Sequence, residues 1–449
     1  MAHHFRCGTL FTACDDRARR DHTVIADRGV IAYVGPTAAA PQPAAGDSVV
    51  DHARHFVMPG LIDGHTHIGA GNANTEEDVD LYSPLEFRAL RMMVNLQRMF
   101  DAGYTGVADG ATTGRVALSC RNAINAGLFK GPRMVCSGPF IANRTGYPDL
   151  YPSWFLNPVA VRTLVHSLDE AIETIRFQAK DGVDFIKICM DGRTRNFDGK
   201  VASSFSEADT RRMVEEANRL GKWVKVHAKG AEGATFAARA GARVICHGAA
   251  LDQRAIDAVL EAGAILCPEL TIIHNFTVFT QPTDSINDMT YIGQAEWEST
   301  VDSMRRARAT GARILAGSDS GFACCPAGEW HALEIKLLVE HVGLTPAEGI
   351  RAGTTINGEL FEGVAKIGRI EPGYAADLVA FDGNPLADIG VLLDKPKIKG
   401  LYMAGERVTT KAPPINMRTE TDFAYRMWQK IYDRKRVAAM AAEGRIRAL

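Results

Sequence analysis

The sequence predicts an α/β protein, a (β/α)8 TIM-like barrel with a small β-sandwich domain built from both chain ends. In the middle of the chain, apolar strand-like runs alternate with stretches of helical periodicity, the pattern of repeated βα units. Short β-prone pieces separated by turn residues occur at both ends of the chain. The length of 449 residues fits one large barrel with an appended domain.

The domain boundaries follow from these changes of pattern. We expect residues 1–57 and 373–412 to form the β-sandwich domain and residues 58–372 to form the barrel. Residues 413–449 are expected to be a C-terminal helical extension, because apolar residues recur there among Arg and Lys. Such an amphipathic helix would pack on the body of the protein or on a second subunit, so a homo-oligomer is an open expectation.

The barrel has eight candidate strands in chain order. They are residues 57–67, 105–109, 133–137, 185–189, 223–227, 243–247, 264–268 and 313–318. Between the first two, apolar residues from Leu85 to Met99 recur on one helical face. Eight parallel βα units close into a barrel whose active site lies at the C-terminal ends of the strands. Functional side chains are therefore expected at strand ends.

Side chains suited to binding metal stand at five of these strand ends. His65 and His67 close the first strand, where alternation places both on one face. The others are Lys187 on strand four, His227 on strand five, His247 on strand six and Asp319 after strand eight. Each one alone has an ordinary structural explanation, such as a buried ion pair or hydrogen bond. Their recurrence in sequence order at one face predicts a metal site.

This pattern resembles the metal-dependent amidohydrolase superfamily over nearly the whole chain. The matching features are PGLIDGHTH at 59–67, Lys187, the pair His227 and His247, GSDSG at 317–321, and GRIEPGYAADLV at 368–379. The likeness is to the branch that contains imidazolonepropionase-like, Xaa-Pro and Xaa-Arg dipeptidase-like, ochratoxin-hydrolysing and phenylurea-hydrolysing enzymes.

The resemblance implies a centre with two divalent metal ions, although the number of ions stays open. A CO2-derived carbamate on Lys187 would bridge them, with His65, His67 and Asp319 on one ion and His227 and His247 on the other. This mixture of nitrogen and oxygen ligands suits zinc, and also permits manganese, cobalt or iron. The ions would activate a bridging water, and Asp319 would act as general base and then general acid. The expected reaction is hydrolysis of a carbon–nitrogen bond in an amide, acyl-amino acid, urea or carbamate.

The substrate, a small molecule, is expected to contact loops beyond the strand ends. The aromatic segment 138–158 includes Tyr151 and either covers an apolar substrate group or packs against the barrel. Arg193 and Arg195 follow strand four and offer guanidinium groups for a substrate carboxylate. His274 and His331 lie beyond strands seven and eight and have either a substrate-binding or a structural role. Segment 138–158 lacks the Gly-Gly-His-type pattern of dipeptidase-like relatives, which weighs against a peptide substrate.

Other classes of function fit the sequence less well. A net charge of −2 gives no reason to expect nucleic acid, and no apolar segment is long enough to span a membrane. Nine cysteines without a repeated spacing are typical of reduced thiols, which favours the cytoplasm. A mononuclear deaminase of the same fold would carry His-x-x-Glu after strand five, whereas Ala228, Lys229 and Gly230 follow His227. A metal-free scaffold protein is the remaining alternative, and the presence of every expected ligand argues against it.

Overall fold

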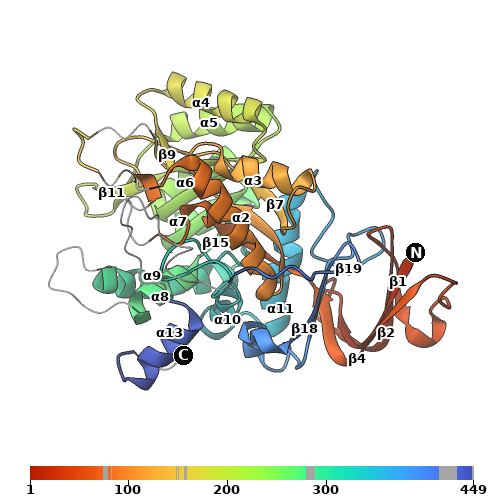
Figure 1. Cartoon of the computed structure of the whole chain (residues 1–449). Coiled ribbons are helices and arrows are strands. Elements are labelled where there is room, and N and C mark those ends of the chain that lie inside the picture. The colour runs from red at the N-terminus through yellow and green to blue at the C-terminus, as the bar shows by residue number, and fades with distance from the viewer. Residues whose placement is uncertain are drawn as a thin grey trace.

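The computed structural model describes residues 1–73, 79–81, 83–147, 149, 151–155, 159–279, 289–413 and 432–446. It has two parts, a helix-covered α/β body and a smaller sheet beside it that contains the N-terminus (Figure 1). Among the described residues, every helix is too short or too polar to cross a membrane.

Parallel strands form the centre of the body. They are β5 (Leu61–Thr66), β6 (Tyr104–Asp109), β7 (Arg133–Cys136), β10 (Phe185–Cys189), β13 (Trp223–Gly230), β14 (Val244–Ala250), β15 (Ile265–Cys267) and β16 (Arg313–Ile314). Strands β5, β6 and β7 form one sheet. A second sheet contains β10, β13, β14, β15 and β16, and β8 (Phe140–Ala142) and β9 (Arg162–Leu164) extend it beyond β10. All eight strand segments expected from the sequence are therefore present. A parallel sheet in an α/β body is confirmed.

Backbone hydrogen bonds connect these two sheets at both edges. On one side, Asp184 N, just before β10, donates to Cys136 O at the end of β7 over 2.9 Å. On the other side, β5 meets the chain that follows β16, because Gly64 N donates to Ala316 O and Asp319 N donates to His65 O, each over 2.9 Å. The last contact brings the residue after strand eight to the end of strand one.

Helices cover the outside of this strand layer (Figure 1). They are α2 (Leu85–Asp101), α3 (Val116–Asn125), α4 (Leu168–Asp181), α5 (Glu207–Arg219), α6 (Ala231–Ala240), α7 (Gln253–Ala262), α8 (Leu270–Phe279), α9 (Met289–Ala309), α10 (Leu333–Leu337) and α11 (Pro346–Arg351). Local sequence sets several boundaries. The side chain of Ser167 caps the start of α4, and Gly182 ends that helix in a left-handed conformation with φ of 89°. On α2, Met92, Leu96 and Met99 are fully buried, which confirms the helical face expected from the sequence.

The small sheet joins the two ends of the chain. Its order is β19 (Glu406–Arg407), β18 (Ile398–Met403), β17 (Leu378–Phe381), β4 (Ser48–Pro59), β1 (Ala2–Phe11), β2 (Ala18–Asp27) and β3 (Val30–Pro36). Strands β4 and β17 pair directly, with Val379 opposite Met58. The strands therefore belong to one hydrogen-bonded sheet, where the sequence suggested a sandwich. The sheet curls, because Phe5 on β1 contacts the Tyr402 ring on β18 at a centroid distance of 4.8 Å across a shared core.

Two further expectations need adjustment at their boundaries. Residues 57–67 are not one strand, since β4 ends at Pro59 in the small sheet and β5 begins at Leu61 in the body. In the C-terminal extension, the structure describes α13 (Arg434–Ala442), which packs through Val437 and Met440, both buried. Within the helical extension expected at 413–449, residues 414–431 and 447–449 lie outside the described residues.

Candidate metal centre

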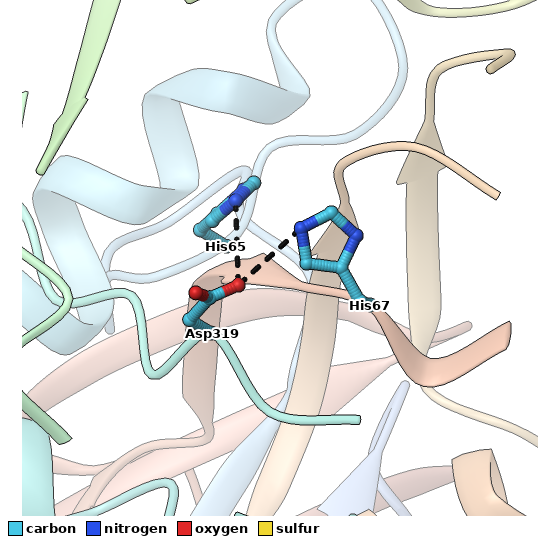
Figure 2. Close-up of side chains that lie close together, drawn as sticks. All are labelled: His65, His67 and Asp319. Carbon is cyan, nitrogen blue, oxygen red and sulfur yellow. Dashed lines mark ion pairs between the residues drawn. The ribbon is translucent and has the colours of Figure 1, made fainter. Parts of the chain in front are cut away.

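The side chains of His65, His67 and Asp319 lie close together (Figure 2). His65 and His67 belong to the first strand of the body, whereas Asp319 follows the last one. Oδ1 of Asp319 lies 3.3 Å from Nε2 of His67 and 3.8 Å from Nε2 of His65. All three side chains are buried. The strand pairing explains the convergence, because Asp319 N bonds to His65 O and His67 N bonds to Ser320 O. Two imidazoles and a carboxylate in this arrangement match the ligands that divalent transition metals prefer.

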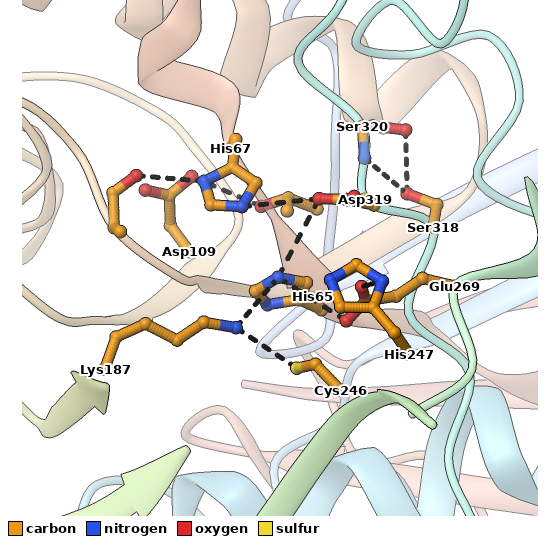
Figure 3. Close-up of polar contacts among 12 residues, drawn as sticks. His65, His67, Asp109, Lys187, Cys246, His247, Glu269, Ser318, Asp319 and Ser320 are labelled. Carbon is orange, nitrogen blue, oxygen red and sulfur yellow. Dashed lines mark hydrogen bonds and ion pairs between the residues drawn. The ribbon is translucent and has the colours of Figure 1, made fainter. Parts of the chain in front are cut away.

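The loop that carries His67 is fixed by Asp109 at the end of β6 (Figure 3). Its carboxylate accepts hydrogen bonds from Thr66 Oγ1, Ile68 N and Thr112 Oγ1. The ring of His67 is oriented by Nδ1, which lies 3.0 Å from the carbonyl oxygen of Ala111. Because a carbonyl only accepts, Nδ1 carries the proton, and Nε2 directs its lone pair toward Asp319.

A second group of side chains lies next to this triad (Figure 3). Lys187 is fully buried on β10, and its Nζ lies 3.2 Å from Nε2 of His65. His247 on β14 holds Nδ1 2.8 Å from Oε2 of Glu269, whose other oxygen lies 3.5 Å from Nε2 of His65. The ring of His227 on β13 lies 4.3 Å from the His247 ring, centroid to centroid. The structure thus brings together all six residues that the sequence assigned to the metal site.

Burial sets the ionisation of these ligands. It lowers the pKa of His65, His67, His227 and His247, so their rings are neutral near pH 7 and able to bind a metal ion. Burial also raises the pKa of Glu269 to about 8, with a further contribution from the Asp319 carboxylate. These directions apply to the protein without a cation, which would favour the ionised carboxylate.

The residues fit a bound cation because several of their buried polar atoms lack hydrogen-bond partners. These atoms are Oδ1 of Asp319, Nδ1 of His247 and both carboxylate oxygens of Glu269. Leaving such groups unpaired away from water costs free energy on the order of 1–3 kcal/mol each, and more for a charged group. The unpaired atoms face one another, as expected for ligands grouped around metal ions.

The polar layer beneath the ligands is, in contrast, hydrogen-bonded. Asp63 accepts from His65 N, from Ser318 N and from Nδ1 of His331 at 2.7 Å. Nε2 of His331 accepts from Gly328 N over 2.8 Å. Both ring nitrogens of His331 therefore have protein partners, which assigns it to internal bonding instead of the substrate contact suggested by its position in the sequence.

The other expected substrate residues are distributed around the rim. Tyr151 packs against Phe155, with ring centroids 5.0 Å apart, and beneath the guanidinium of Arg162. Arg195 is exposed and donates to carbonyl oxygens of its own hairpin, β11 (Asp191–Arg195) and β12 (Val201–Ser203). His274 on α8 contacts Trp297. The side chain of Arg193 lies outside the described residues.

Sequence reasoning missed Glu269 and Asp191 as residues of the site, whereas it included Tyr147 in the aromatic segment. Glu269 follows β15 and is described above, and Asp191 places Oδ1 3.5 Å from Nε2 of His227. Tyr147, from the aromatic segment, stacks on the ring of His227 at 5.0 Å. The strand-end rule that located the other ligands also covers Glu269 and Asp191, since each lies within two residues of the end of β15 or β10.

The α/β body brings histidines, a lysine and an aspartate together near its strand ends as groups that could hold a metal ion. The comparisons with known proteins identify the class of protein. The amidohydrolase family model matches residues 56–408. Ochratoxinase from Aspergillus niger is 26% identical over 421 residues, covering 89% of this chain and 85% of that protein. Imidazolonepropionase from Deinococcus deserti is 24% identical over 426 residues, covering 86% and 92%.

Solved structures give the same result. A Xaa-Pro dipeptidase with bound methionine in its active site superposes with a TM-score of 0.81 at 26% identity, covering 91% of this chain and 100% of that one. Phenylurea hydrolase B shares the fold, with a TM-score of 0.73 at 23% identity over 91% and 97% of the two chains. The protein belongs to the amidohydrolase family, and the branch expected from the sequence is confirmed. It is an enzyme that hydrolyses carbon–nitrogen bonds.

Proposed function

We propose that the protein is a metal-dependent amidohydrolase with a binuclear, zinc-type centre at the C-terminal end of a closed eight-stranded barrel. Barrel closure is supported by the hydrogen bonds at both sheet edges and by one inner apolar cluster, to which β5 contributes Ile62, β10 contributes Phe185 and β15 contributes Ile265. The observation that carries the proposal is the convergence of the buried side chains of His65, His67 and Asp319 beside His247, with ligand atoms of Asp319 and His247 left unpaired.

The ligands divide by position. His65, His67 and Asp319 would hold one ion, and His227 and His247 would hold the other. Lys187 would join the two positions once its neutral amine adds CO2, which forms a carbamate and releases one proton. Its Nζ lies 3.2 Å from Nε2 of His65 and 3.1 Å from Sγ of Cys246 on β14, the strand that also carries His247, which supports a carbamate between the two positions.

Asp319 is the proton carrier of the reaction. Bound divalent ions supply Lewis acidity, which polarises the scissile carbonyl and lowers the pKa of the attacking water. The Asp319 carboxylate, whose Oδ1 accepts no hydrogen bond from the described protein atoms, would take the proton of that water and pass it to the departing nitrogen. The products are an amine and a carboxylic or carbamic acid.

The substrate class is an amide-like bond with an aromatic or apolar group on one side. The ring of Tyr147 stacks on His227, and the same segment carries Tyr151 packed against Phe155 and Arg162. This aromatic segment supports such a group. The names of the relatives, among them ochratoxinase, Xaa-Pro dipeptidase and phenylurea hydrolase, support a carbon–nitrogen bond as the bond that is cleaved. Arg195 is the candidate partner for a substrate carboxylate.

Metal analysis combined with a hydrolysis screen tests the proposal. We expect stoichiometric divalent metal in the purified protein, loss of activity on chelation, and recovery with Zn²⁺ and bicarbonate. The screen compares N-acyl amino acids, Xaa-Pro and Xaa-Arg dipeptides, aryl amides, phenylureas and carbamates. A protein that binds no divalent metal and hydrolyses none of them would overturn the proposal. If substrates with a free carboxylate are hydrolysed faster, and Arg195→Ala removes this preference, Arg195 is the residue that binds the carboxylate.

A further inference from the structure

Glu269 is a buried acid for which the metal site described so far gives no role. It follows Pro268 after β15, is 0% exposed, and neither carboxylate oxygen has a hydrogen bond of acceptable geometry among the described residues. A buried carboxylate keeps its charge when it is paired with a cation or with donors, and otherwise it holds a proton. Its ion pairs in the described part of the chain are with His65 and His247 alone, both of them proposed metal ligands.

The backbone at Glu269 repeats that of two proposed metal ligands. His247 has φ of 68°, Glu269 of 57° and Asp319 of 54°. His247 lies within β14, Glu269 follows β15 and Asp319 lies beyond β16, three neighbouring strands of one sheet. Positive φ at residues other than glycine is uncommon and costs on the order of 1 kcal/mol, and such strain gathers at functional sites. The shared conformation directs all three side chains into one space.

The two oxygens of Glu269 face different halves of the site. Oε1 lies 3.5 Å from Nε2 of His65, which belongs to the first ion position. Oε2 lies 2.8 Å from Nδ1 of His247, which belongs to the second. Glu269 and Asp319 each belong to more than one group of ligand atoms that lie within 4.8 Å of one another. The carboxylate thus spans the gap between the two positions.

The neighbouring lysines are bonded to other groups. Nζ of Lys187 donates to the sulfur of Cys246 over 3.1 Å, and Nζ of Lys225 donates to the carbonyl of Gly64 over 2.6 Å. Among the described ion pairs, neither lysine pairs with Glu269 at salt-bridge distance.

The charge of the proposed centre also favours a further acid. Two divalent ions would carry more positive charge than Asp319 and a carbamate on Lys187 can neutralise. A further carboxylate lowers that excess in a buried site.

We propose that Glu269 is a metal ligand that bridges the two ion positions, with one carboxylate oxygen toward each. The inference rests on the proposed function, because it requires a binuclear centre. It adds a bridge from β15 to the one that Lys187 supplies from β10. An isosteric amide at this position keeps the shape and removes the charge, so it is the informative change.

Metal affinity of Glu269→Gln tests the bridge, with Glu334→Gln as the matched control. Glu334 is equally buried, but hydrogen bonds from Leu270 N and Thr271 N satisfy its carboxylate. After dialysis at fixed free Zn²⁺, mass spectrometry of the metal should give two ions per chain for wild type and for Glu334→Gln. In Glu269→Gln we expect the affinity for one ion to fall at least about tenfold. Equal affinity in wild type and Glu269→Gln would overturn the inference and leave the proposed function intact.

A structure of the zinc-loaded wild type tests the same point without a variant. We expect each Glu269 oxygen at about 2.0–2.2 Å from one ion. Two ions bound with both oxygens of Glu269 beyond coordination distance would overturn the bridge alone. Absence of any metal would overturn the proposed function and the bridge together. In Mn²⁺-loaded protein, the bridge predicts a spin coupling between the ions that changes in Glu269→Gln and not in Glu334→Gln.

Discussion

Glu269 and Glu334 are two buried glutamates of the same region that differ in one respect. Burial raises the pKa of each to about 8. Glu334 accepts hydrogen bonds from the backbone and the hydroxyl of Thr271 and from Leu270 N, and so holds the first turn of α8. Glu269 has no such donors. Burial alone therefore does not distinguish a functional acid from a structural one. The presence or absence of hydrogen-bond donors to the carboxylate does.

The same contrast separates two layers at the strand ends. In the upper layer, Asp319 and His247 carry unpaired atoms that face each other, and we assign them to metal. In the lower layer, Asp63 and His331 have complete hydrogen bonding, and we assign them to stability. Changes in the upper layer should therefore affect the reaction, and changes in the lower layer should affect unfolding.

The largest expected effect is that of Asp319→Asn. Removal of the proton carrier should lower kcat by about 10³-fold or more. Unfolding of the metal-free protein should shift little, because Oδ1 has no hydrogen bond to lose. Steady-state kinetics and thermal unfolding with and without metal measure the two effects, and Asp382→Asn, an exposed change on the small sheet, is the control. Activity within tenfold of wild type would contradict the assignment.

A somewhat smaller effect on rate is expected from Lys187→Ala, because it removes the other bridge between the ions. Metal content should fall and the rate should drop by about 10²-fold or more, since supporting groups alone change metal affinity by about 10–100-fold. Lys225 is the matched control. It lies opposite Lys187 in the β10–β13 register and is equally buried, but it donates to the carbonyl of Gly64.

We expect Lys225→Ala to lose stability and to keep more of its metal than Lys187→Ala. Element analysis and urea unfolding of both variants separate the two outcomes. If Lys187→Ala retained two ions and the wild-type rate, the role of Lys187 as a carbamate bridge would be wrong.

The sequence predicted the upper layer in part because strand ends are readable from local pattern. Alternation and the order of strands located His65, His67 and Asp319 without knowledge of any contact. Glu269 was missed because strand seven ends in Cys-Pro-Glu with no histidine, and its importance appears only when its lack of hydrogen bonds is known. The role of His331 stayed open from the sequence, since its partner Asp63 is 268 residues away and no local pattern records that pairing.

The small domain illustrates the same limit at the level of the fold. β-prone pieces near both ends predicted that the ends meet, and the pairing of Val379 with Met58 confirms it. Whether the strands form one curled sheet or two facing sheets depends on long-range register. Side-chain alternation specifies which face is buried but not which edges are joined, so the sequence supplied the strands and left the joining of the sheet open.

In the lower layer, Asp63→Asn should lower the free energy of unfolding and have a smaller effect on the rate of bond cleavage. Asparagine keeps one acceptor oxygen and places a donor where His65 N, Ser318 N and His331 converge. We expect the free energy of unfolding of the metal-free protein to fall by about 2–4 kcal/mol. Urea unfolding measures this change. A loss below about 0.5 kcal/mol would show that satisfied and unsatisfied groups contribute alike, against the division into layers.

The smallest expected effect is a change with pH in the difference in stability between wild type and Glu334→Gln. Its folded pKa of about 8 exceeds the ordinary value near 4.3, so the unfolded chain ionises first as pH rises. Stability that comes from the protonated form is therefore complete below about pH 4 and is lost between about pH 4 and 8. Glutamine does not titrate, so Glu334→Gln lacks this loss. We expect the stability of wild type relative to Glu334→Gln to fall by about 1 kcal/mol or more from pH 5 to pH 8. Urea midpoints measured across that range, with metal removed, test it. A difference that is independent of pH would mean that the donors on Leu270 and Thr271 keep the carboxylate ionised, and that Glu334 differs from Glu269 in charge as well as in bonding.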